Sequence, residues 1–157
     1  MDEIIATDTT REGPLTLRKS AKLRHRSLVE GVFAGGKNIY DYPLRLTWRS
    51  LDAEALKGCF RDEVPPLVGP LQMLVTVPKK KRRHAVDRVL MRRRIREAFR
   101  LHSRPLRRRI EADPAMRTVS LAFVYLHTGN ESYAAIEKRM VNLLRKLERR
   151  LWPCEQP

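Results

Sequence analysis

A nearly continuous apolar run, TVSLAFVYLH from Thr118 to His127, constrains the fold of this chain most strongly. Strands so apolar along their whole length are typical of the centre of a sheet that is covered on both faces. A turn at Gly129-Asn130 follows, and then a segment whose apolar residues recur every three or four positions. That spacing predicts a long amphipathic helix with one buried face, formed by Ile136, Met140, Leu144, Leu147 and Leu151.

The first half of the chain predicts a helix followed by a strand. Leu28 and Val32 lie four residues apart, as on one face of a helix, and Gly35-Gly36 is expected to end that helix. Residues 44–48 then alternate apolar and polar side chains, which is typical of a half-buried strand.

The middle of the chain predicts a loop, a strand and a basic helix. Residues 51–70 are rich in proline near their end and are expected to form a loop, or a strand and a loop. Residues 71–78 predict another strand, and Pro105 is expected to break the helix that contains residues 88–100. The predicted fold class is therefore α/β, an α+β sandwich with about four strands in one sheet packed with three helices.

Length and composition indicate one domain in a reducing compartment. We expect residues 1–14 to be a disordered acidic tail and residues 15–152 to form a single domain. The start of the chain lacks the basic and apolar regions of a secretory signal. The two cysteines, Cys59 and Cys154, are far apart and form no metal-binding pair, so two free thiols and a cytoplasmic location are expected.

The charge balance favours a polyanionic partner. The chain carries 33 Lys and Arg residues against 18 Asp and Glu residues, which gives a formal net charge of +15. Such a charge steers polyanions toward a protein. Arginine dominates the centre of the chain, and its planar guanidinium matches phosphate geometry and stacks on bases. Nucleic acid is therefore favoured over a membrane surface.

The segment RVLMRRRIREAFR, from Arg88 to Arg100, contains six arginines among its thirteen residues. At about 100° per residue, five of them fill one arc of a helical wheel. These five candidate RNA-binding residues are Arg88, Arg92, Arg93, Arg96 and Arg100. The apolar residues of the segment lie on the opposite side, ready to pack on a sheet. Glu97 is four residues from Arg93 and is expected to pair with it.

A solvated charged face is the ordinary alternative for such a helix. Like charges four residues apart repel by a few tenths of a kcal/mol per pair, and this helix has only Glu97 to compensate. Lys80 and Lys81, just upstream, extend the same basic patch. A membrane-bound helix is not favoured, because Phe99 is the only aromatic residue on the narrow apolar side. The segment therefore predicts a surface for nucleic-acid phosphates.

No pattern in the sequence predicts a catalytic or metal site. The four histidines are scattered, and the acidic pair Asp62-Glu63 lies in the predicted loop. A protein nuclease needs a general base or metal ligands. We therefore assign no catalytic residue and no metal ligand, and expect no hydrolysis by this chain alone.

The segment AVDRVLMRRRIREAFR resembles the signature of the protein subunit of bacterial ribonuclease P. That family carries the pattern A-V-x-R-N-x-x-K-R-x-x-R-E. The residues that match it here are Ala85, Val86, Arg88, Arg93, Arg96 and Glu97, with Arg92 in place of the lysine. The upstream segment LRKSAKLRHRSLVEGVFAGGK and the strand before the basic run also follow the order of the family, from about Leu15 to Leu151.

The resemblance implies a function in tRNA processing. It implies that the chain binds ribonuclease P RNA, which performs the cleavage, and assists removal of the 5′ leader of precursor tRNA. It also implies Mg²⁺ at the active site of the RNA, with none bound tightly by this chain, and a left-handed βαβ crossover through the arginine helix. The alternative is a structural RNA-binding protein of ribosomal type with no processing role.

The resemblance also implies a cleft for the 5′ leader between the first helix and the sheet. The candidates there are Phe33, Arg45 and Thr47. Phe33 could stack on a base, as aromatic residues do in single-strand sites, or could belong to the core. Trp48 alternates with apolar residues and is expected in the core.

Val89 departs from the family pattern, which has asparagine at that position. The helical wheel places Val89 at about 100°, inside the arginine arc. Burying it would pull Arg96 and Arg100 toward the core, and an unpaired buried guanidinium costs several kcal/mol. Val89 is therefore predicted to be exposed.

Overall fold

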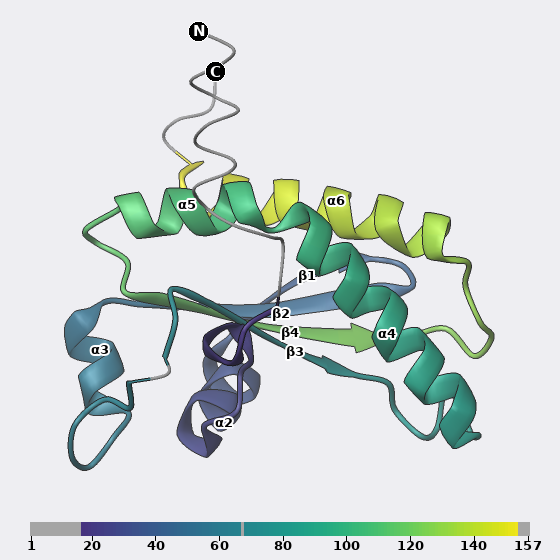
Figure 1. The fold of residues 1–157 in the computed structure, drawn as a ribbon, viewed down its shortest axis with the longest axis horizontal. Coiled ribbons are helices and arrows are strands. Elements are labelled where there is room, and N and C mark those ends of the chain that lie inside the picture. Colours follow the sequence, from purple (N-terminus) through teal and green to yellow (C-terminus); the bar gives the residue numbers. More distant parts are fainter. Residues whose placement is uncertain (1–16, 67, 154–157) are drawn as a thin grey trace, which may run out of the picture.

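The computed structural model describes residues 17–66 and 68–153 (Figure 1). These residues form four strands, five α-helices and one 3-10 helix. In chain order the elements are η1 (Lys19–Ala21), α2 (Arg26–Gly35), β1 (Lys37–Asp41), β2 (Leu44–Leu51), α3 (Ala53–Gly58), β3 (Leu71–Thr76), α4 (Ala85–His102), α5 (Arg104–Ala112), β4 (Thr118–Tyr125) and α6 (Tyr133–Leu151). The predicted tail, residues 1–14, lies outside the described residues, as does Cys154.

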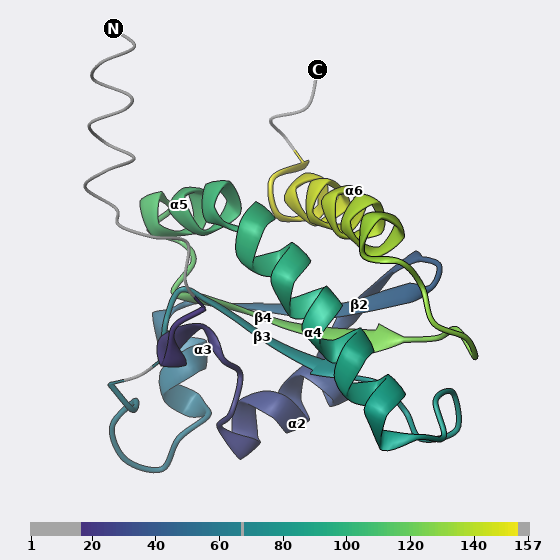
Figure 2. The same ribbon diagram turned by 45° about the vertical axis from the view of Figure 1, so that its right-hand side comes forward.

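The four strands form one mixed sheet in the order β1-β2-β4-β3. β1 pairs with β2 and β2 with β4 in antiparallel fashion, whereas β3 and β4 are parallel. α4, α5 and α6 cover one face of the sheet, and α2 and α3 lie on the other (Figures 1 and 2). The layered α/β class predicted from the sequence is confirmed.

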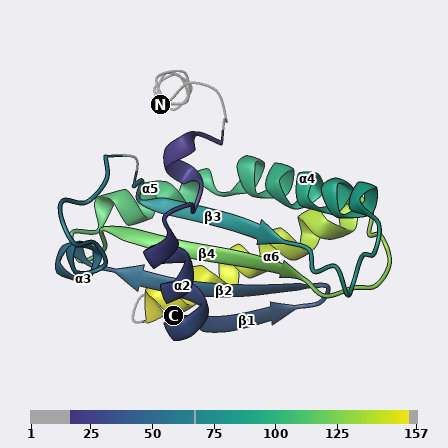
Figure 3. The same cartoon turned by 90° about the horizontal axis from the view of Figure 1, so that it is seen from below.

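The connection from β3 to β4 is left-handed. In Figure 3 both strands run toward the right with β3 above β4, and α4 and α5 lie behind the sheet. With the strands turned upright, the chain moves to the right through a layer behind the sheet, which is the left-handed sense. Nearly all such crossovers in proteins are right-handed, so this connection is a distinctive feature of the fold.

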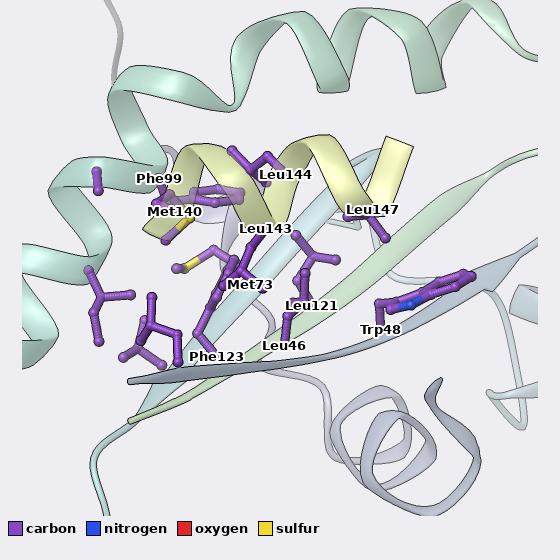
Figure 4. Packing of buried hydrophobic residues seen from close by; sticks show 14 of the residues in the cluster. Leu46, Trp48, Met73, Phe99, Leu121, Phe123, Met140, Leu143, Leu144 and Leu147 are labelled. Carbon is purple, nitrogen blue, oxygen red and sulfur yellow. The ribbon is translucent and has the colours of Figure 1, made fainter. Parts of the chain in front are cut away.

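The main core lies between the sheet and α4, α5 and α6 (Figure 4). All eight residues of β4 are buried, as the apolar run predicted. Met140 and Leu147 of α6 are fully buried against this face, and Trp48 is only 6% exposed. Each apolar side chain of this size contributes about 1.5–3 kcal/mol when it is fully buried. The predicted buried face of the last helix is confirmed for Ile136, Met140, Leu144 and Leu147, whereas Leu151 is partly buried. The core position of Trp48 is confirmed.

A smaller core lies under α2. Leu28 and Val32 of this helix pack with Ala122 of β4, and all three are buried. α2 passes directly into β1 through Gly36, where a Cβ atom would collide with the carbonyl oxygen of Val32. Only glycine allows the chain to turn so closely here. This turn sets the position of α2 across the sheet.

Residues 51–70 differ from the predicted loop, because they include α3. The carboxylate of Asp52 accepts a hydrogen bond from the backbone N–H of Ala55 at 2.7 Å and so caps this six-residue helix. Leu56 anchors the helix in the smaller core. The prediction of three helices was too low, because α3 is short and Pro105 starts α5 as a separate helix.

The strand β1 was also not predicted. Its five residues carry one buried side chain, Ile39, so the alternation is weak. No helix within residues 17–66 or 68–153 is long and apolar enough to cross a membrane.

Candidate nucleic-acid interface

The orientation of α4 is fixed by its apolar side. Met91, Ile95, Ala98 and Phe99 are buried, and their spacing of four, three and one residues places them on one face. The ring of Phe99 meets that of Phe123 on β4 edge to face, with 5.8 Å between the ring centroids. The opposite face of α4 must therefore point to solvent.

The solvent-facing side of α4 carries the predicted arginine arc. Arg93 and Arg96 are exposed, and Arg92 is half-buried. Val89 is 39% exposed among them, as predicted, and Val86 is 78% exposed one turn earlier. The predicted rotation of the helix is therefore confirmed, and two exposed valines lie within the basic surface.

Arg88 and Arg100 have partners within the protein. Arg88 donates hydrogen bonds from Nη1 to the carbonyl oxygens of Arg82 and Arg83, at 3.0 and 2.8 Å. Arg100 forms a two-point ion pair with Glu97, with nitrogen–oxygen distances of 2.9 and 2.5 Å. The hydrogen bond from Arg100 lowers the pKa of Glu97.

The predicted pairing of Glu97 with Arg93 is wrong, because Glu97 pairs with Arg100 three residues later. Both spacings bring side chains together on a helix, so spacing alone did not decide between them. The consequence is that Arg93 stays exposed on the basic surface. Arg94 lies outside the predicted arc, and its side chain donates a hydrogen bond to the backbone carbonyl oxygen of Glu131.

The loop between β3 and α4 adds charge to the same end of the helix. Lys80 is exposed and Lys81 is half-buried. Arg82 pairs with Asp87 of α4, with 2.9 Å between Nη2 and Oδ2, and also donates to the carbonyl oxygen of Thr128. These contacts hold the lysine-bearing loop against the first turn of α4.

Asp87 is a positioning residue that the sequence did not reveal. Its carboxylate also accepts a hydrogen bond from Nδ2 of Asn130 at 3.1 Å, which ties α4 to the loop between β4 and α6. The hydrogen bond from Asn130 and the charge of Arg82 lower the pKa of Asp87. The partners are 43 residues apart in the sequence, so no local pattern could have indicated them.

The basic surface continues beyond α4 across the β3 edge of the sheet. A hollow there is lined by Arg96 of α4, by Lys22 and Arg24 of the N-terminal segment, and by Leu74 and Val75 of β3. Lys22 and Arg24 are exposed. Lys22 and Arg24 were not among the predicted RNA-binding residues, because only the fold brings the N-terminal segment beside α4.

The candidates for the leader cleft lie on the other face of the sheet, beside α2. Phe33 is 47% exposed, so its assignment to the core is excluded and its ring is available for stacking. Arg45 is half-buried, and its Nε is buried without a hydrogen-bond partner in the described part of the chain. Tyr40 pairs with Arg45 in the sheet and is 58% exposed, which places a second aromatic ring in this region.

Thr47 lies below the surface of this region. Its side chain is 4% exposed, and its hydroxyl donates to Oδ1 of Asn38 at 2.7 Å. Thr47 therefore orients Asn38, which is exposed, and does not itself reach the surface. Among the predicted residues, Phe33 and Arg45 remain the candidates for contact with a ligand.

The histidines of the described residues lie apart from one another and contact different partners. No cluster of three or more His, Cys, Asp or Glu side chains suited to a metal ion occurs in residues 17–66 and 68–153. His102 contacts Glu137 at 3.0 Å between α4 and α6, and His127 contacts the hydroxyl of Tyr42 at 2.8 Å. His84 is exposed at the start of α4.

Comparison with known proteins assigns this arrangement to a family. Residues 17–148 match the sequence model of the family described as Ribonuclease P. The chain belongs to the ribonuclease P protein family. The match runs from η1 to most of α6, so it includes both the arginine helix and the strands and helix that form the sheet face beside α2.

Relatives and solved structures agree with this assignment. The ribonuclease P protein components of two strains of Porphyromonas gingivalis are 32% and 31% identical to the chain over 124 residues, which is 79% of this chain and 80% of theirs. The structure of the Staphylococcus aureus RNase P protein has the same fold, with a TM-score of 0.56, 12% identity and coverage of 82% of this chain and 95% of that one. A mutant of the S. aureus protein gives a TM-score of 0.58.

Proposed function

We propose that this chain is the protein subunit of a ribonuclease P holoenzyme that removes the 5′ leader of precursor tRNA in the cytoplasm. The observation that carries this proposal is the exposed arginine surface of α4 in a member of the family. Arg93 and Arg96 point to solvent there, and Lys80 extends the surface from the preceding loop. The RNA subunit is the proposed partner of this surface.

The arginine surface is suited to the phosphate backbone rather than to base edges. Guanidinium groups bind phosphate oxygens through paired N–H donors, and such contacts position a nucleic acid without reading its sequence. Arg88 contributes indirectly, since its bonds to the carbonyl oxygens of Arg82 and Arg83 hold the lysine loop in place. Arg100 is already paired with Glu97, so it contributes less charge to the surface.

The sheet face beside α2 is the proposed site for the 5′ leader. Phe33 and Tyr40 are exposed aromatic residues, and stacking of a base on such a ring contributes about 1–3 kcal/mol in single-strand sites. Arg45 pairs with Tyr40 in the sheet and is half-buried, and its guanidinium is the proposed donor for a phosphate. Asn38, held by Thr47, offers a further polar contact.

Catalysis is proposed to belong to the RNA subunit, with Mg²⁺ bound at the RNA active site. The described residues of this chain include no group of three or more His, Cys, Asp or Glu side chains that could hold a metal ion. The role of the chain is then to bind and orient. Its positive charge offsets the repulsion between two RNAs, which is greatest when Mg²⁺ is scarce.

Reconstitution with the ribonuclease P RNA of the same organism tests this proposal. The isolated chain is expected to leave precursor tRNA intact, whereas adding it to the RNA should raise the cleavage rate at low Mg²⁺. Mature tRNA should be bound more weakly by the holoenzyme than precursor tRNA with a leader. Cleavage by the protein alone, or equal binding of the two tRNAs, would contradict the proposal, and equal binding would favour a structural RNA-binding role.

A further inference from the structure

The outer side of α6 is strongly basic and lies away from the arginine surface of α4. Six of the residues between Lys138 and Arg150 are basic: Lys138, Arg139, Arg145, Lys146, Arg149 and Arg150. At about 100° per residue and with Lys138 at zero, Lys138, Arg145 and Arg149 fall within about 20° of one line. These three side chains are exposed and form a stripe along the outer face of the helix.

Both acidic residues of α6 are turned away from this stripe. Glu137 contacts His102 of α4 and the hydroxyl of Tyr133, each at 3.0 Å. Glu148 lies 3.9 Å from Arg109 of α5. The acids of α6 thus serve contacts between helices, and the outer stripe has no carboxylate within the helix to balance it.

The flank of α6 beside β1 extends the positive charge to the edge of the sheet. Lys146 donates to the carbonyl oxygen of Tyr40 at 3.2 Å, which lays its side chain over β1. Arg150 lines a hollow at the end of β1 together with Lys37 and Arg49. The stripe and this flank therefore form one basic surface, which we call the α6 surface.

The α6 surface and the arginine surface lie over opposite edges of the sheet. α6 packs over β1 and β2, whereas α4 packs over β3 (Figures 2 and 3). With about 4.8 Å between neighbouring strands, the edge strands are roughly 14 Å apart. α4 and α6 pack against each other through contacts such as His102 with Glu137, so the two surfaces lie on neighbouring helices and the α6 surface extends the positive charge toward the β1 edge.

From these observations we propose that the α6 surface binds the phosphate backbone of a double-helical RNA segment, in addition to the RNA bound by α4. The stripe from Lys138 to Arg149 is about 16 Å long at 1.5 Å per residue. Its residues include no aromatic side chain, so it lacks the stacking platform of a single-strand site. Double-stranded RNA is bound mainly through its backbone and shape, which suits a straight row of cations.

A pair of charge reversals tests this proposal in the full chain. R145E/R149E reverses two of the three charges of the stripe, and K57E/R61E on the α3 side is the matched control, because all four residues are exposed. Each replacement changes the charge by two, so both double variants lower the formal net charge from +15 to +11. Binding to an RNA duplex of about 20 base pairs, longer than the roughly 16 that a dedicated duplex-binding domain spans, is measured against salt concentration.

The α6 variant is expected to bind the duplex at least about tenfold more weakly and to lower the salt slope by up to about two units, since each lost phosphate contact removes about 0.7–0.9. The control should change affinity much less. R145Q/R149Q should also lower the affinity for the duplex and the salt slope. This variant separates loss of positive charge from any effect of glutamate on the helix. Thermal unfolding of each variant shows that it is folded. An α6 variant that matches the control would overturn the proposal.

The same experiment keeps this inference apart from the proposed function. R93A/R96A on α4 is measured in parallel with ribonuclease P RNA. Weaker binding by this variant, with no effect of R145E/R149E on either RNA, would overturn the α6 proposal and leave the proposed function standing. If R93A/R96A did not weaken binding of ribonuclease P RNA, the proposed function would fall, whereas binding of the duplex by R145E/R149E would still decide the α6 proposal.

Discussion

Val89 shows how a single residue reports the rotation of α4. It is partly exposed at the centre of the arginine arc, whereas Met91, two positions later, is fully buried. The helical period places these two residues on opposite sides of the helix. The arginines on the same side as Val89 face solvent. The exposure of Val89 therefore indicates which arginines of α4 point to solvent.

Replacing Val89 by asparagine restores the polar residue of the family pattern. Both residues have similar helix propensity, so the free energy of unfolding should change by no more than about 0.5 kcal/mol, as for most surface substitutions. RNA affinity should be preserved or improved. Met91→Ala is the buried comparison, and it should cost about 2–5 kcal/mol. Both changes are measured by denaturant unfolding.

A loss of more than about 2 kcal/mol on Val89→Asn would be typical of core disruption and would contradict the orientation of α4.

Other single-residue details could not be predicted from the sequence. The choice of Arg100 over Arg93 as the partner of Glu97 depends on how the three side chains are oriented in the folded helix. The burial of Thr47 depends on Asn38 of the neighbouring strand, which local pattern does not reveal.

At the scale of elements, α4 depends on contacts at its N-terminal end. Asp87 joins α4 to two loops. It forms an ion pair with Arg82 of the preceding loop and accepts a hydrogen bond from Asn130 of the loop before α6. A carboxylate in the first turn of a helix also interacts favourably with the helix dipole. Tyr125 supports the same loop by donating to the carbonyl oxygen of Gly129 at 2.6 Å, and burial raises its pKa to about 12.

Asp87→Asn should loosen the start of α4 and remove part of the acid dependence of stability. The pKa of Asp87 is lowered in the folded protein, chiefly by Asn130 and further by Arg82, so the folded state favours the carboxylate. Its stabilising contribution is present above the unfolded pKa of about 3.9 and is lost as the pH falls through the lower folded pKa. The two proteins should therefore differ in free energy of unfolding near neutral pH and converge in acid.

Denaturant titrations at a series of pH values measure this difference, and hydrogen exchange should show faster exchange in the first turn of α4. Asn130→Ala is the companion variant. Because Asn130 and Asp87 share one hydrogen bond, the double variant should lose less free energy of unfolding than the two single variants lose in total. A difference between wild type and Asp87→Asn that is as large in acid as at neutral pH would contradict this role.

Elements with a strong period could be predicted from the sequence, and elements with short or weak patterns could not. The apolar run of β4 and the four-residue spacing in α6 carry enough apolar positions to define a strand and a helix. α3 has six residues and one buried side chain, Leu56, so its apolar pattern is too short to recognise. The Asp52 cap was the available signal for that helix.

At the scale of the whole molecule, the sheet separates the three surfaces that are proposed to meet RNA. The arginine surface of α4 lies toward the β3 edge, the α6 surface toward the β1 edge, and Phe33 and Arg45 on the opposite face beside α2. The sequence predicted the first of these surfaces, since it lies within one helix. It could not predict that Lys22 and Arg24 join Arg96 around a hollow, because that neighbourhood exists only in the folded chain.

The most direct test of this account is the salt dependence of binding to ribonuclease P RNA. For R93A/R96A, the slope of log K against log salt should fall by somewhat under one unit for each arginine, while the melting temperature stays close to that of wild type, because both side chains are exposed. The control K57A/R61A, at two exposed basic positions on the α3 side, should leave the slope nearly unchanged. An unchanged slope for R93A/R96A together with a large fall in melting temperature would show that these arginines are structural and would contradict the account.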